Sequence, residues 1–578
     1  MSEKSEIRDG MRIEWDVPIA MDDGIVLRAD VFRPPQEGRY PVLMNYGPYG
    51  KGLPFKDGYP AQWAALERDH PDVMEGSTNK YQVWEACDPE RWVPDGYVCI
   101  RVDSRGAGRS PGKIDCFSAR ETEDYYQCIE WAARQPWCNG KVGLSGVSYY
   151  AMNQWQVAAK RPPHLTAICP FEGASDFYRD AARHGGILTT FWIRWYPVQV
   201  MSVQHGVGTR GRTNPDTGEL VAGPETIPDE ALAALRADLP TEHRSHKLDD
   251  AYFRERSAHL PDIEVPLLSC ANIGGQGLHL RGNIEGFVRA GSKQKWLEIH
   301  GLEHWTEYYT RYGRDLQKRF YDHFLKGIEN GWNKQPRVVL HVRHVDRFVE
   351  RAEDEWPLAR TQWTRFYLDA NTKRFGTEAN APTGQAAFRA MSEQITFWSE
   401  PLKNEIEITG PAAAKLFVSS STADSDVFVT LRAFALNGRE VLLAGAVDPN
   451  TPLSYGWLRA SHRKLDRKLS TEYRPHHTHD EQQPLVPGEV YELDVEIWPT
   501  SIVLPRGYRL ALTIHGKDFD HGLPEPMPQL YGRPMRGCSV FLHDDPGDRD
   551  PKLYDGTTTV HTGGARRSYV LLPVIPPR

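Results

Sequence analysis

The sequence predicts an α/β domain followed by an all-β domain. At 578 residues the chain is too long for one hydrophobic core, which predicts two or three domains. From about residue 11 to 345, short apolar runs alternate with amphipathic stretches, a pattern typical of a mostly parallel sheet with crossover helices. Beyond about residue 360 the pattern changes to short alternating strands separated by Gly, Pro and Asp turns, which indicates a β-sandwich.

Six apolar runs are the expected strands of the α/β part. Turn residues and then a polar or helical segment follow each run, as expected when a strand leads into a crossover connection. The runs are residues 41–46, 97–103, 141–145, 165–169, 265–270 and 295–299.

Two irregular insertions interrupt this alternation. The first, 52–94, carries Trp63 and Trp84 and is expected to form a wall of a cleft. The second, 176–260, carries an aromatic block with Phe191, Trp192 and Trp195, and is expected to be a cap over the carboxyl ends of the strands. The predicted division is therefore a core of 1–175 and 261–345, a cap of 176–260 and a β domain of 346–578.

Composition excludes several classes of function. Hydrophobic residues make up 40% and charged residues 25% of the chain, which is ordinary for a folded protein. Lys and Arg number 69 against 77 Asp and Glu, a net charge of −8, which excludes a surface for wrapping nucleic acid or an anionic membrane. A small-molecule partner is therefore expected. The N-terminus shows no basic segment followed by an apolar run, the pattern of a signal peptide, so the expected location is the cytoplasm. A homo-oligomer stays open.

The sharpest local motif is a strand that ends in a tight turn and continues into a helix. Ser148 lies at this turn, between the strand at 141–145 and the helical segment 152–160. A serine there projects from the top of the sheet, and the next backbone N–H lies at a helix N-terminus and can stabilise an oxyanion. The G-x-S-x-G spacing is imperfect, since Tyr150 occupies the position of the last small residue. Ser145 is the rival nucleophile, although it lies inside the strand end.

The residues around this turn resemble the nucleophile segment of the cocaine-esterase-like hydrolases, which are related to the X-prolyl dipeptidyl peptidases. The resemblance begins with Gly146-Val-Ser-Tyr-Tyr-Ala and Gln154-Trp-Gln. It extends over nearly the whole chain, through the segments 16–24, 27–34, 47–51, 103–112, 425–431 and 456–463.

This resemblance implies an α/β-hydrolase core, a helical cap and a C-terminal jelly-roll domain. It implies that Ser148 is the nucleophile and that the Tyr49 hydroxyl and the Tyr149 N–H form the oxyanion hole. It also places the catalytic histidine in the loop after the last core strand, at His304. His300 is the nearest competitor, but its position at the strand end favours a structural role.

The third member of a triad departs from the family pattern. The family places an aspartate after the strand at 265–270, and the loop at 271–279 contains no carboxylate. Only the placement of the acid matters, so another strand end can supply it. Glu172 follows the preceding strand and is the predicted acid, with Asp176 as its rival. The alternative of a serine–histidine dyad stays open.

The resulting hypothesis is a serine acyl hydrolase that cleaves an ester or amide bond, without a cofactor or a metal. Trp63, Trp84, Phe191, Trp192 and Trp195 suggest an apolar acyl or aryl group in the cleft. Three alternatives stay open: an Xaa-Pro dipeptidyl peptidase, an acyltransferase or C–C hydrolase on the same triad, and a catalytically silent protein that binds a ligand through the jelly-roll domain. The peptidase would need a carboxylate for a free α-amino group, and no segment of the sequence identifies one.

Overall fold

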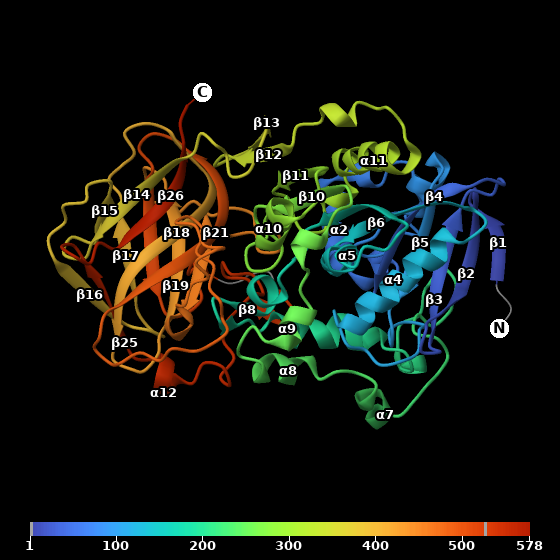
Figure 1. The fold of residues 1–578 in the computed structure, drawn as a ribbon, viewed down its shortest axis with the longest axis horizontal. Helices are drawn as coiled ribbons and strands as arrows, with labels where there is room; N and C mark the ends of the chain where they lie inside the picture. The colour runs from blue at the N-terminus through green and yellow to red at the C-terminus, as the bar shows by residue number, and fades with distance from the viewer. Residues whose placement is uncertain (1–3, 525–528, 578) are drawn as a thin grey trace.

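The computed structural model describes residues 4–524 and 529–577, and it contains two large sheets (Figure 1). The first sheet has the strand order β1-β2-β3-β5-β4-β6-β7-β10-β11-β12-β13, and its strands from β5 to β12 run parallel. Its strands are β1 Lys4–Arg8, β2 Met11–Ala20, β3 Val26–Arg33, β4 Tyr40–Gly47, β5 Val98–Asp103, β6 Cys138–Val147, β7 Leu165–Phe171, β10 Leu267–Asn272, β11 Lys295–His300, β12 Val338–Arg343 and β13 Phe348–Glu353.

The α/β pattern read from the sequence is confirmed. All six expected runs form strands, as β4, β5, β6, β7, β10 and β11. The first sheet extends to Glu353, beyond the boundary expected at residue 345, because β13 pairs antiparallel with β12. The division into a core, a cap and a C-terminal domain at the stated boundaries stays a prediction.

Helices cover both faces of the first sheet. Alternate residues of β4 point to opposite faces: Leu43 packs in the cluster that contains Phe320 of α11, whereas Val42 packs in the cluster that contains Ile129 of α4. α11 and α4 therefore lie on opposite faces. The main helices of this region are α4 Ala119–Ala133, α5 Tyr149–Ala158, α10 Arg281–Arg289 and α11 Arg311–Lys326.

Both insertions fold as short elements outside the sheet. In Figure 1 the second of them, drawn in green, runs along the lower side of the molecule between the two sheets. The first contains α1 Phe55–Gly58, α2 Pro60–Asp69 and α3 Pro89–Trp92, and the second contains β8 Arg183–His184, β9 Ile187–Leu188, α6 Phe191–Trp195, α7 Asp229–Ala234, α8 Leu239–Ser245 and α9 Ala251–Glu255.

The C-terminal part is an all-β domain, as predicted. Its strand order is β16-β25-β18-β21-β20-β19-β22-β17-β15-β14-β26, and β26 pairs again with β18, so that nine strands close into a ring. The jelly-roll topology stays a prediction. The strands are β14 Gln362–Asp369, β15 Arg374–Gly376, β16 Gly384–Arg389, β17 Gln394–Trp398, β18 Ile406–Ser420, β19 Asp426–Phe434, β20 Ser454–Arg459, β21 Tyr491–Leu504, β22 Arg509–His515, β25 Thr557–Thr562 and β26 Tyr569–Ile575, with the small hairpin β23 Gln529–Leu530 and β24 Arg533–Pro534 and the helix α12 Pro551–Tyr554 beside them.

Within the described residues, none of the helices combines the length and the apolar character needed to cross a membrane.

Candidate active site

Ser148 lies at a strained turn between β6 and α5. Its φ of 56° is in the left-handed region, which is uncommon for a residue other than glycine, and such strain is found where a structure holds a functional side chain in place. The Ser148 N–H donates to the Phe171 carbonyl over 3.1 Å, which ties the turn to the neighbouring strand β7. Tyr149 is the first residue of α5, so the helix itself gives its N–H no partner. The turn therefore presents a hydroxyl and a backbone donor together.

The imperfect motif spacing has a structural explanation. The ring of Tyr150, which occupies the position of the expected small residue, lies against two glycines. A Cβ on Gly47 would come 2.6 Å from Tyr150 Cε1, and one on Gly146, whose φ is 145°, would come 2.4 Å from Tyr150 Cβ. The next residue, Ala151, faces Gly173, where an added Cβ would lie 2.9 Å from the alanine Cβ. Two missing side chains thus accommodate the tyrosine that the motif rule disfavours, and a third makes room for Ala151.

Tyr49 lies on the loop after β4, close to this turn. The loop is held because the Lys51 N–H donates to Asp103 Oδ1 over 2.6 Å and the Lys51 ammonium pairs with Asp30 over 2.7 Å. The Tyr49 ring makes an edge contact with the Tyr149 ring at a centroid distance of 5.9 Å. Burial, and then the negative charge of Glu85, raise the pKa of Tyr49 well above its usual value, so the hydroxyl keeps its proton and can donate it in a hydrogen bond.

His304 and Glu172 meet as the sequence hypothesis requires. The Nδ1 atom of His304 lies 2.8 Å from Glu172 Oε2. The other oxygen of Glu172 lies 2.9 Å from His300 Nε2, whose Nδ1 lies 2.7 Å from Glu298. Glu172 is therefore a buried carboxylate between two imidazoles, and it follows β7, one strand before β10, after which the family pattern places the acid.

A second carboxylate, Glu85, lies at the other end of the His304 ring. Its Oε1 atom is 2.9 Å from His304 Nε2, and its buried Oε2 atom has no hydrogen-bond partner among the described residues. Glu85 has a φ of 60°, and its N–H donates to the Tyr309 hydroxyl over 2.6 Å. Burial raises the pKa of Glu85, and the hydrogen bond from His304 opposes that rise.

Ser148 makes its hydrogen bond with a different imidazole, that of His279. Ser148 Oγ lies 3.2 Å from His279 Nε2, and the His279 ring stacks on the His304 ring with a centroid distance of 4.8 Å and an angle of 8° between the planes. No hydrogen bond joins Ser148 to His304 in the part of the chain that the structure describes. The serine and the predicted base are thus neighbours with other partners.

The two stacked imidazoles have opposite shifts in pKa. Burial lowers the pKa of His304, but the charge and hydrogen bond of Glu172, followed by those of Glu85, outweigh it and raise the pKa to about 10. Burial, and then the positive charge of His304, lower the pKa of His279 to about 3. Burial would raise the pKa of Glu172, but His304 and His300 lower it to about 2. These shifts favour an ionised Glu172, a protonated His304 and a neutral His279 in this arrangement.

A cavity of about 410 Å³ opens over these groups. Of the five aromatic residues predicted to bind substrate, three line this cavity: Trp84, Phe191 and Trp195. The other two, Trp63 and Trp192, do not line it. Trp63 packs on Phe55, and the Trp192 indole donates to the Ala181 carbonyl over 2.7 Å. Tyr49, Glu85, Ser148, His279 and His304 also line the cavity.

The all-β domain contributes to the same cavity. Its residues Ala446, Val447, Tyr531 and Phe541 are part of the wall. The Ala446 carbonyl also accepts from the His304 N–H over 2.8 Å, so the second domain holds the backbone of the predicted base.

The rival residues have other partners. Ser145 Oγ lies 2.7 Å from the Tyr308 hydroxyl beneath the turn. Asp176 accepts from the Arg179 N–H over 3.0 Å and forms an ion pair with the Arg179 guanidinium. Sequence reasoning missed Glu85, His279 and the contact of Ala446. His279 stands in the loop that was noted for lacking an acid, but no motif spacing marks it or Glu85.

Comparison with known proteins places the chain in a family. The model of the X-Pro dipeptidyl-peptidase (S15) family matches residues 23–306, and that of the X-Pro dipeptidyl-peptidase C-terminal non-catalytic domain matches residues 330–571. A solved CocE/NonD family hydrolase from Staphylococcus aureus is 31% identical and covers 98% of this chain and 94% of its own, with a TM-score of 0.82. The chain belongs to the cocaine-esterase-like, X-Pro dipeptidyl-peptidase family of hydrolases.

Two curated relatives match this S15-family hydrolase over nearly their full length, and both are named esterases. The cocaine esterase of Rhodococcus sp. is 24% identical over 97% of this chain and 98% of its own, and a putative serine esterase of Mycobacterium bovis is 24% identical over 91% and 94%. The S15-family chain is accordingly a serine hydrolase of the esterase and peptidase type, with an α/β-hydrolase domain followed by a C-terminal β domain.

Proposed function

We propose that this hydrolase cleaves an ester or amide bond through an acyl-Ser148 intermediate. The observation that carries the proposal is the strained turn that presents Ser148 to the cavity, beside an imidazole already paired with a buried carboxylate. Ser148 Oγ attacks the substrate carbonyl while Nε2 of the neutral form of His304 accepts its proton. The Tyr49 hydroxyl and the Tyr149 N–H stabilise the oxyanion.

The protonated His304 then gives its proton to the leaving group as the acyl-enzyme forms. A water molecule attacks the acyl carbon, His304 accepts the proton of that water, and the acid leaves as the proton returns to Ser148. Glu172 holds the ring through Nδ1 and stabilises the imidazolium. The chain's own residues carry every proton in this scheme.

In the structure, His304 and Ser148 are each hydrogen-bonded to a partner other than the one that the reaction requires. His304 Nε2 faces Glu85 and Ser148 Oγ faces His279, so proton transfer requires that Nε2 exchange Glu85 for Ser148. A group on the substrate that binds Glu85, or a proton on that carboxylate, would release Nε2. His279 holds the hydroxyl in the cavity until then.

The acyl-enzyme itself is the direct test of the proposed reaction. Acid quenching of a reaction with p-nitrophenyl butyrate within its first turnovers should trap a butyryl group on the peptide that contains Ser148. A butyryl group on another residue, or turnover without any adduct under several quench times, would contradict the covalent route.

Tyr49→Phe is expected to lower kcat by about a hundredfold and to change KM little, because the lost donor stabilises the oxyanion only in the transition state. Steady-state kinetics with an aryl ester measures this. Tyr59→Phe is the matched control, since the half-buried Tyr59 lines the same cavity and its ring stacks on Trp84 with a centroid distance of 4.0 Å. Equal losses in both variants would remove Tyr49 from the oxyanion hole.

Glu85→Gln is expected to move the rising limb of the pH–rate profile to lower pH. A base works only when neutral, and two carboxylates raise the pKa of His304 to about 10, so kcat/KM of the wild type should rise with pH through the neutral range. Removing one negative charge lowers that pKa and shifts the limb down by about one unit or more. The control is Glu303→Gln, which removes an exposed carboxylate from the loop that carries His304. This variant should leave the rising limb of the pH–rate profile at the wild-type pH.

A substrate with a free amino group is a second candidate, favoured by the unpaired Glu85 oxygen in the cavity. An ammonium group there would both bind Glu85 and free His304 Nε2. Phenylalanine p-nitrophenyl ester and 3-phenylpropanoate p-nitrophenyl ester differ only in this amino group. A preference of at least about tenfold for the amino ester, lost in Glu85→Gln, would support this candidate, since one charged hydrogen bond is worth that much. Equal rates for both esters would exclude it.

A further inference from the structure

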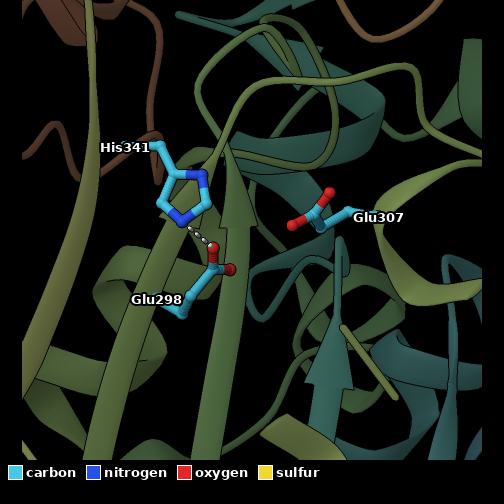
Figure 2. Close-up of side chains that lie close together, drawn as sticks. All are labelled: Glu298, Glu307 and His341. Atoms are coloured by element: carbon cyan, nitrogen blue, oxygen red, sulfur yellow. Dashed lines mark ion pairs between the residues drawn. The ribbon is translucent and has the colours of Figure 1, made fainter. Parts of the chain in front are cut away.

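A second group of potential ligands lies outside the cavity, at the carboxyl ends of β11 and β12. Glu298 belongs to β11, His341 to the adjacent parallel strand β12, and Glu307 to the short helical turn that follows the catalytic loop. Figure 2 shows the three side chains directed toward a common point. One ligand atom from each lies within 4.8 Å of the others, and His341 Nε2 is 3.7 Å from Glu298 Oε1.

Neither carboxylate in this group has hydrogen bonds on both of its oxygens among the described residues. Glu298 is 1% exposed, and its Oε1 atom has no hydrogen-bond partner among the residues that the structure describes, whereas its Oε2 atom accepts from His300 Nδ1. Glu307 is 4% exposed, and the hydrogen bonds and ion pairs of the described residues do not involve its carboxylate. Buried carboxylates without partners are costly, because burial removes the water that stabilises their charge.

The charges around this point are also unbalanced. Four buried carboxylates, those of Glu85, Glu172, Glu298 and Glu307, follow one another from the cavity to this group. Within the described chain no lysine or arginine forms an ion pair with any of them, and only the imidazoles of His300, His304 and His341 do. A bound cation would supply the missing positive charge.

We propose that Glu298, Glu307 and His341 bind a divalent cation. Two carboxylate oxygens and one imidazole nitrogen suit Zn²⁺ or Mn²⁺, because these ions accept both oxygen and nitrogen ligands. The 3.7 Å between Glu298 Oε1 and His341 Nε2 is a separation that two bonds of about 2.1 Å to one ion can span. His341 is 19% exposed at its side chain, so the ion can reach the site and water can complete its coordination.

Two neighbours compete for His341. The Tyr312 hydroxyl lies 3.1 Å from Nε2, and the exposed carboxylate of Glu350 on β13 lies 3.8 Å from it. The ion replaces the hydrogen bond with Tyr312. The site lies outside the catalytic cavity, and the chain Glu298–His300–Glu172 joins it to His304, so the ion fixes the far end of the network that positions the base.

Binding is tested on the full chain after dialysis against EDTA, by calorimetric titration with ZnCl₂ and separately with MnCl₂ in the absence of substrate. One of the two salts should bind with a stoichiometry of one and micromolar or tighter affinity. Glu307→Gln and, as a second variant, His341→Ala should each weaken that binding by about a hundredfold or more. Circular dichroism and the melting temperature check that both variants are folded.

The matched control is Glu350→Gln, which removes the exposed carboxylate beside His341 and should leave the affinity unchanged. The proposal is overturned if neither salt binds the wild type at one equivalent. It is equally overturned if Glu350→Gln loses as much affinity as Glu307→Gln, because the ion would then lie at the surface. The titration measures no turnover, so its outcome is separate from that of the proposed hydrolysis.

Discussion

Ser148→Ala is expected to lower kcat/KM for an aryl ester by about 10⁴-fold or more, the largest effect of any single change. The alanine variant retains the cavity and the oxyanion donors, but it has no nucleophile to form the acyl-enzyme. The remaining rate would come from water attack in a site that still stabilises the oxyanion. Initial rates over several enzyme preparations, with the wild type as reference, measure the loss.

Ser145→Ala is the matched control for this change. Ser145 lies on β6, three residues before Ser148, is buried, and makes a hydrogen bond with the Tyr308 hydroxyl. The control should keep kcat/KM within about tenfold of the wild type, because it loses one internal hydrogen bond. If the two variants exchanged these results, Ser145 would be the nucleophile.

His304→Ala should have the second largest effect, a loss of about 10⁴-fold in kcat/KM, because it removes both the proton acceptor and the group that protonates the leaving group. His279→Ala should cost only about tenfold, the usual contribution of one hydrogen bond to the placement of Ser148. The same ester assay compares the two variants. The contrast is sharp because the two rings stack on each other and line the same cavity.

The reverse order of losses would make His279 the base. The structure would explain that outcome, since Ser148 Oγ lies 3.2 Å from His279 Nε2. The pKa values argue for His304: a pKa lowered to about 3 makes His279 a weak proton acceptor, while release of Glu85 would bring the pKa of His304 down from about 10 toward neutrality. Losses of similar size in both variants would contradict the assignment of separate roles.

The sequence predicted the parts of the site that local patterns encode. Apolar runs between turns located the strands, and a strand–turn–helix with a serine at its turn located Ser148, which needs no knowledge of distant contacts. Glu172 was predicted from the logic that neighbouring parallel strands end at one edge, and its carboxylate lies 2.8 Å from His304.

The partners that the sequence did not predict depend on long-range packing. Glu85 reaches His304 from an irregular insertion more than two hundred residues earlier, and Ala446 reaches it from the second domain. Long-range packing also decides which of the predicted aromatic residues line the cavity. Trp195 faces the cavity, whereas Trp192, three residues earlier on α6, faces the cap interior. The packing of this short helix sets the difference. Composition alone could not separate them.

The nucleophile assignment is tested most directly by labelling purified protein with a fluorophosphonate and mapping the adduct, on the wild type and on Glu172→Gln. One phosphonyl group should appear on Ser148 of the wild type, and its rate of formation should fall by about a hundredfold or more in the variant, since Glu172 orients His304. The neutral glutamine keeps the shape of the side chain, so the comparison isolates its charge and hydrogen bonding. No adduct on the wild type, or an adduct on a residue other than Ser148, would contradict the account, and equal labelling rates would show that Glu172 is not the acid.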